Sequence, residues 1–291
     1  MKALKRLVSP FLLIPLATGA CLLLAASTLA KAEALTAPQT GLHYTSGSNL
    51  DADGHYTPGK LGFNLADVSS VSQLNSLPAG VKGLVWLGLC NGADAKFISA
   101  VRPYIGNPGV FGFYLMDEPD PTGRWGKLCS AANLKAESDW IHTNAPGVIT
   151  FIVLMNMGTD TKPSFANTYN PTNTGIDLYG LDPYPCKKAL SNGCDYSVIG
   201  VSVTAAVSSG IPLDKIVPVY QAFGGGGYAA WTMPTARQEQ EILAKWAEVV
   251  PHPVFDMVYA WGSQHSDTSL ERSPAQQAVF AEHNRGERIG K

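Results

Sequence analysis

The chain has 291 residues and a formal net charge of -2, with 15% charged and 45% hydrophobic residues. A charge so close to zero excludes the broad basic surface with which proteins bind nucleic acid, so no nucleic-acid partner is expected. The length and hydrophobic fraction suit one large α/β domain.

The N-terminus has the pattern of an export signal. A basic start precedes an apolar run over residues 7–30, and small residues at 30, 32 and 34 offer cleavage sites. We therefore expect residues 1–34 to be a signal peptide, residues 35–291 to be the mature domain, and the protein to be secreted or periplasmic without stable membrane insertion. The alternatives are an uncleaved anchor and a lipoprotein modified at Cys21, the second of which Thr18 disfavours.

Four cysteines follow the signal, and an even number in an exported chain suggests disulfides. Cys186 and Cys194 bracket a short polar loop, so we expect them to pair, which leaves Cys90 with Cys129. Free thiols and a metal site are the alternatives. The sequence has no Cys-x-x-Cys motif and no clustered histidines, so neither a metal nor a cofactor is expected.

From residue 62 onward, apolar strand-like runs alternate with amphipathic helical stretches. Strands are expected at 62–68, 81–89, 110–116, 148–155, 175–182, 216–223 and 255–262, with a weaker candidate at 41–45. Helices are expected at 71–77, 93–104, 131–143, 198–208, 235–249 and 274–283. Repeated βα units predict a parallel sheet, and eight strands predict a closed (β/α)8 TIM barrel in a single domain. An open doubly wound sheet is the alternative, but its Gly-x-Gly-x-x-Gly motif is absent.

The stretch 110–121, V-F-G-F-Y-L-M-D-E-P-D-P, carries the clearest functional signal. A buried strand ends abruptly in carboxylates, and Pro119 cannot continue its hydrogen-bond ladder. Barrel enzymes build their sites at the carboxyl ends of the strands. Glu118 is therefore the leading catalytic candidate, and Asp117 caps the loop or orients it. A structural ion pair between Glu118 and Arg124 is the non-catalytic alternative.

The ends of the other expected strands add amides, carboxylates and aromatic rings to the same rim. In order these residues are Asn64, Asp67, Trp86, Met155, Asn156, Asp182, Tyr184, Gln221, Trp261, Gln264 and His265. Aromatic faces stack on sugar rings, amides bind hydroxyls and carboxylates transfer protons, so the rim predicts a carbohydrate site. We expect Asn64, Trp86, Tyr184, Gln221 and Trp261 to bind substrate, although Tyr184 and Trp261 also fit core packing. Glu239 and Glu241 are expected on an exposed helix face.

Several of these segments resemble one known family. I-S-A-V-R-P-Y-I-G-N-P-G-V-F-G-F-Y-L-M-D-E-P is similar to the fourth-strand region of the (β/α)8 glycoside hydrolase clan that includes cellulases and mannanases. In that clan the strand leads to Asn-Glu-Pro, whose Glu is the general acid/base; here the triplet is Asp117-Glu118-Pro119. I-D-L-Y-G-L-D-P-Y-P, V-P-V-Y-Q-A-F-G and Y-A-W-G-S resemble the sixth, seventh and eighth strands. The resemblance implies a glycoside hydrolase and assigns 41–45 to the first strand.

One departure from the family pattern affects the mechanism. The clan's seventh strand ends in a nucleophilic Glu, and Gln221 occupies that position; an amide cannot form the covalent intermediate. The second catalytic carboxylate is then Asp182, or Asp117 behind it, although an Asp before Pro also starts turns. The enzyme can instead invert, with Asp182 holding water, or use a nucleophile of the substrate. The contrasting hypothesis is a carbohydrate-binding protein without activity, and a barrel enzyme of another class is a third.

Overall fold

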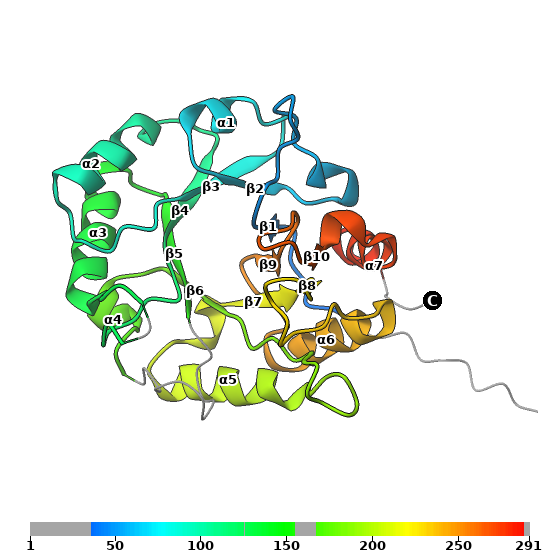
Figure 1. Ribbon diagram of the computed structural model, residues 1–291. Helices are drawn as coiled ribbons and strands as arrows, with labels where there is room; N and C mark the ends of the chain where they lie inside the picture. Colours follow the sequence, from blue (N-terminus) through cyan, green and yellow to red (C-terminus); the bar gives the residue numbers. More distant parts are fainter. Residues whose placement is uncertain (1–35, 125, 155–166, 288–291) are drawn as a thin grey trace, which may run out of the picture. The chain divides into compact units, whose positions relative to one another are not determined.

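Eight parallel strands close into a barrel in the computed structural model, which describes residues 36–124, 126–154 and 167–287 (Figure 1). The strands are β1 (His43–Thr45), β2 (Leu65–Val68), β3 (Lys82–Trp86), β4 (Val110–Asp117), β5 (Ile149–Leu154), β6 (Leu178–Leu181), β7 (Ile216–Gln221) and β9 (Asp256–Tyr259). Each pairs with the next in chain order, and β1 closes the ring against β9. The predicted (β/α)8 barrel is confirmed, including its weakest strand.

Helices cover the outside of the barrel (Figure 1). They are α1 (Val71–Asn75), α2 (Ala95–Val101), α3 (Ala131–Asn144), α4 (Pro171–Thr174), α5 (Ser197–Ser208), α6 (Ala236–Val249) and α7 (Pro274–Asn284). Local sequence fixes where several of them begin: Ser130 caps α3, and Thr235 forms a capping box with Gln238 at α6. All helices expected from the sequence are present, and the short α4 is an addition.

Two hydrophobic cores follow from the alternation of side chains along the strands. One fills the barrel interior and includes Tyr44, Phe151 and Phe255. The other, the outer core, lies between the strands and the helices. A residue's place in one core or the other therefore tells whether its side chain points into the barrel or away from it.

The expectation that Glu239 is exposed was wrong. Its side chain is fully buried in α6, and neither carboxylate oxygen has a hydrogen-bond partner among the described residues. Burial raises the pKa of Glu239 well above its ordinary value. The spacing of Glu239 with Ile242, Leu243 and Trp246, all buried, follows one helix face, so the helical period itself indicated the inner side.

Both expected disulfides are confirmed: Cys90 bonds to Cys129, and Cys186 bonds to Cys194. The first ties the loop after β3 to the loop after β4, and the second closes a loop after β6. Disulfides persist in oxidising compartments, so the two bridges fit an extracellular location. The expected signal peptide, Met155 and Asn156 lie outside the described residues. Every helix among the described residues is too short or too polar to cross a bilayer.

Candidate active site at the mouth of the barrel

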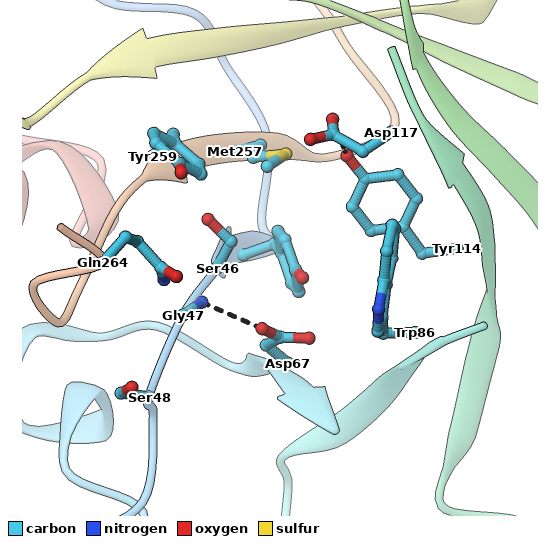
Figure 2. A pocket seen from close by; sticks show the side chains of 11 residues that line it. Ser46, Gly47, Ser48, Asp67, Trp86, Tyr114, Asp117, Met257, Tyr259 and Gln264 are labelled. Carbon is cyan, nitrogen blue, oxygen red and sulfur yellow. Dashed lines mark hydrogen bonds between the residues drawn. The ribbon is translucent and has the colours of Figure 1, made fainter. Parts of the chain in front are cut away.

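Two adjoining pockets open at the carboxyl ends of the strands. The central compartment, about 360 Å³, is lined by side chains from β1, β2, β3, β4 and β9 (Figure 2). The small compartment, about 160 Å³, lies against β4, β6 and the chain after β7. Asp117 and Tyr259 line both, so Asp117 stands where the two compartments meet.

A β-bulge in β4 turns Asp117 toward the pocket. The register against β5 shifts between Tyr114 and Met116, where one extra residue is accommodated. Tyr114 points into the barrel, Leu115 and Met116 both pack against the outer core, and Asp117 then points inward again. In an unbulged strand, Tyr114 and Asp117 would face opposite sides. Bulges are common next to active sites because they redirect a side chain in this way.

Glu118 adopts a left-handed backbone conformation, with φ of 41°. This region is unfavourable for any residue with a side chain other than Asn or Asp, and such residues concentrate at functional sites. The Glu118 amide donates to the carbonyl of Val153 at 3.0 Å, which holds the kink against β5. As a result the half-buried Glu118 lines the small compartment beside Asp117.

The electrostatics of the site centre on Asp117. Its side chain is open to the compartment, but the surrounding walls displace water, and this desolvation together with the charge of Glu118 raises the pKa of Asp117 to about 6. The Tyr114 hydroxyl donates to Asp117 Oδ1 at 2.6 Å and opposes the rise. Asp117 therefore changes its charge near neutral pH, within reach of acid–base chemistry.

Asp67 is a pocket carboxylate to which sequence reasoning gave no role. It extends from β2 into the central compartment, where the Gly47 amide donates to its Oδ2 at 2.9 Å (Figure 2). Burial raises the pKa of Asp67. Beside it lies the fully buried Tyr44, whose pKa is raised well above its usual range by burial and by the charges of Asp67 and Asp117. The position of Asp67 at a strand end was the available signal.

Asp182 and Tyr184 join Asp117 and Glu118 in the small compartment. Asp182 lies directly after β6 and is buried. The pKa of Tyr184 is raised mainly by the burial of Tyr184 and next by the charge of Asp182. Four further aromatic rings complete the lining: Phe223, Tyr228, Trp231 and Tyr259. The structure thus brings the three expected catalytic carboxylates and one expected sugar-binding tyrosine together.

Trp86 projects from the end of β3 over the central compartment, as Figure 2 shows. Its ring and that of Tyr114 form a T-shaped pair, with 4.8 Å between the ring centroids and 77° between the planes. Gly88, with φ of 63°, backs the indole so closely that a Cβ there would lie 2.7 Å from it. Yet 37% of Trp86 remains exposed, so the indole is held in place while still accessible.

The substrate-binding role expected for Asn64 is wrong. β2 begins at Leu65, so Asn64 lies at the amino end of the strand, opposite the mouth. Its amide accepts from the His43 backbone at 2.9 Å and donates to the Gly41 carbonyl at 2.8 Å. Asn64 joins two strands at the base of the barrel, and Asp67 is the residue of β2 that reaches the mouth.

Gln221 and Trp261 are also placed differently from the sequence expectation. Gln221 is fully buried; its amide accepts from the Cys186 backbone and donates to the carbonyls of Cys186 and Thr232, which joins two loops. Trp261 is fully buried in the outer core, with the Lys60 ammonium 5.4 Å from its ring centre. Neither lines a compartment of the mouth, so both substrate contacts are corrected to structural roles. Tyr259, two residues earlier, is the aromatic residue at that strand end.

Two clusters among the described residues could offer three metal ligands each. In the first, buried Asp256 is hydrogen-bonded to His43 at 2.8 Å and to His283 at 2.6 Å, so it has direct partners without a metal. Burial alone would lower the pKa of His43, but the Asp256 carboxylate outweighs it and raises that pKa. His43 and Asp256 begin their strands, which places this cluster at the base of the barrel. The second cluster lies in an exposed turn at 51–55.

Comparison with solved structures identifies the fold. A fungal endo-β-N-acetylglucosaminidase of glycosyl hydrolase family 18 superimposes with a TM-score of 0.53 at 12% identity, covering 87% of this chain and 99% of that one. A Lactobacillus rhamnosus β-glucuronidase gives a TM-score of 0.53 at 13% identity, covering 87% of this chain and 51% of that one. This chain therefore spans about half the length of the glucuronidase. It has the (β/α)8 fold that these glycoside hydrolases share.

No family model matches the sequence, and no curated protein is similar to it.

Proposed function

We propose that the protein is an exported glycoside hydrolase that cleaves a poly- or oligosaccharide, as the resemblance to the cellulase and mannanase clan implies. The observation that carries this is the meeting of Glu118, Asp117 and Asp182 in one aromatic-walled compartment. Glycosidic cleavage requires carboxyl groups on both sides of the bond, with aromatic surfaces to hold the sugar rings. The end of β4 and the residue that follows it supply two carboxyl groups, and the segment after β6 supplies the third.

In the proposed mechanism Glu118 is the general acid and Asp182 activates water. Burial, together with the charge of Glu118, raises the pKa of Asp117 to about 6, so Asp117 is ionised above that pH. Glu118 gives its proton to the leaving oxygen as the glycosidic bond breaks, and Asp182 takes a proton from the attacking water. Asp117, anchored by Tyr114, orients Glu118 and offsets positive charge on the reacting sugar. Because only ionised Asp117 can offset that charge, activity should rise as the pH passes about 6.

Asp182 is the second carboxylate in place of the one that is missing at Gln221, and water is the nucleophile. The buried amide of Gln221 holds two loops in place, so it has no part in the chemistry. With Asp182 as a base for water, the reaction inverts the anomeric configuration. Proton NMR of the first-formed product tests this: the inverted anomer is expected, whereas retention would remove Asp182 from this role and favour a nucleophile of the substrate.

Hydrolysis of a polysaccharide panel by the purified protein tests the proposed function itself. Glu118→Gln should abolish cleavage of natural glycosides but spare aryl glycosides, because a good leaving group needs no proton. Glu248→Gln, at an exposed glutamate of α6, is the matched control and should leave activity unchanged. If Asp117→Asn shows the aryl-glycoside pattern instead, Asp117 is the acid. Activity unaffected by both substitutions would remove the pair from the mechanism.

The alternative function is carbohydrate binding without cleavage, which the absence of a carboxylate at Gln221 favours. Binding of oligosaccharides without turnover across the panel would support it.

The export signal is tested separately by N-terminal sequencing of the secreted protein, which should begin near residue 35.

A further inference from the structure

A third compartment continues the active-site cleft beyond Trp86. It is the largest of the three, about 540 Å³, and is lined by the segment after β1, the end of β2, the residue after it and α1. It shares Ser48, Asp67 and Trp86 with the central compartment. We call it the outer compartment. The small, central and outer compartments therefore form one continuous series across the mouth of the barrel.

The outer compartment has the chemistry of a sugar subsite. Its lining carries hydroxyl, amide and carboxylate groups, including Asn49, Asp51, Ser69 and Gln73. Trp86 forms its boundary with the central compartment and is more than one-third exposed. An accessible indole beside polar groups is suited to a sugar ring, whose C–H face stacks while its hydroxyls bind.

The position of Trp86 is determined by its neighbours. Gly88 backs the indole, and any side chain there would displace it. The ring of Tyr114 forms a T-shaped pair with Trp86, and its hydroxyl donates a hydrogen bond to Asp117 (Figure 2). Tyr114 thus contacts both Trp86 and Asp117. A sugar ring stacked on Trp86 would therefore lie at a fixed distance from Asp117.

The charge of the cleft restricts the substrate. Three carboxylates line the central and outer compartments, namely Asp51, Asp67 and Asp117. None of the described residues that line these two compartments is a lysine or an arginine. A uronic acid chain would bring like charges into the cleft at a Coulombic cost.

We propose that the three compartments form an extended cleft for an uncharged linear polysaccharide, which the enzyme cleaves within the chain, with the outer compartment as a distal subsite. Because this rests on the proposed function, binding and cleavage are measured separately. Calorimetry with Glu118→Gln, using cello-, manno- and chito-oligosaccharides from disaccharide to hexasaccharide, should show affinity rising with length for one series. Polygalacturonate oligomers should bind more weakly.

Two variants address the outer compartment directly. Ala52→Trp fills it and should weaken hexasaccharide binding by about tenfold while leaving the disaccharide unchanged. Gly88→Ala displaces the indole and should cost about fivefold, in line with the loss of one aromatic contact. Ala79→Trp, at an exposed turn outside the three compartments, is the control. Thermal unfolding of each variant separates a blocked cleft from a misfolded barrel.

The outcomes distinguish this inference from the proposed function. Length-dependent binding that Ala52→Trp abolishes, without hydrolysis by the wild type, supports the cleft and contradicts the hydrolase. Hydrolysis from the chain end only, binding independent of length, or tightest binding of polygalacturonate would overturn the extended cleft. Cleavage within the chain by the wild type, seen as early loss of viscosity, supports both.

Discussion

Tyr114→Phe should raise the pKa of Asp117. The Tyr114 hydroxyl donates at 2.6 Å to Asp117 Oδ1, and this bond lowers a pKa that burial and Glu118 raise to about 6. A hydrogen bond to a charged group contributes about 1.5–3 kcal/mol, and 1.36 kcal/mol corresponds to a change of one in pKa, so the pKa should rise by about 1–2. Phenylalanine keeps the ring that meets Trp86, so the substitution isolates the hydroxyl.

Carbon-detected NMR titration of the aspartate carboxyl groups measures this pKa without a substrate, with Asp117→Asn to assign the signal. Tyr104→Phe, whose ring packs against Phe113 outside the barrel, is the matched control and should leave the titration unchanged. An Asp117 pKa in Tyr114→Phe equal to or below the wild-type value would refute the account of the site's electrostatics. In an active enzyme the rise of activity near pH 6 should move to higher pH in parallel.

Three further predictions concern stability. Glu118→Gly should be more stable than Glu118→Ala, and both should abolish activity: glycine relieves the left-handed conformation, about 1–2 kcal/mol, at an entropic cost of about 0.5–1 kcal/mol, and the two variants lose the same side-chain contacts; urea unfolding showing the alanine variant to be the more stable would contradict this. Glu239→Met should stabilise the protein, and by more at higher pH. The raised pKa of Glu239 means that the folded wild type keeps a proton that the unfolded chain loses, so the stability of the wild type falls above pH 4.5 by up to about 1.4 kcal/mol per pH unit. If the unfolding temperature of Glu239→Met fell with pH as steeply as that of the wild type, the prediction would be wrong; Glu248→Gln is the control. Replacing Cys186 and Cys194 by serine opens a loop with a sequence separation of 8 and should cost about 2.5 kcal/mol from chain entropy; an unchanged urea midpoint would contradict that contribution.

The sequence was sufficient for the parts of the fold that depend on local pattern. Runs of apolar residues located the barrel strands, and the capped, periodic stretches located the helices. The disulfides followed from the short loop between Cys186 and Cys194, since one local pair leaves only one other. Residues directly after long buried strands, such as Glu118 and Asp182, were also placed correctly at the mouth.

The errors in placing site residues arose where the exact first or last residue of a strand could not be predicted. Asn64 was counted among the residues at the carboxyl ends of the strands, but β2 starts one residue after it, so Asn64 lies at the base. Trp261 was taken as a strand end, but the strand stops at Tyr259 and the chain turns Trp261 into the outer core. The bulge that points Asp117 inward depends on the register against β5, which no local pattern specifies.

The roles of Gln221 and Asp67 required three-dimensional contacts. Gln221 lies at the expected strand end, but its amide is occupied by loop backbone that comes from two distant segments. Asp67 was visible at its strand end, yet only the barrel brings it near Tyr44 and Asp117. Position along a strand thus predicted which residues approach the mouth, and packing decided which of them face it.

A crystal structure of Glu118→Gln with the hexasaccharide that binds most tightly tests the central claim most directly. The account predicts sugar rings in all three compartments, one of them against Trp86, with a glycosidic oxygen within hydrogen-bonding distance of residue 118 and Asp182 on the other side of that bond. A sugar bound away from the mouth of the barrel, or a bound chain whose glycosidic oxygens all lie far from residues 117 and 118, would contradict it.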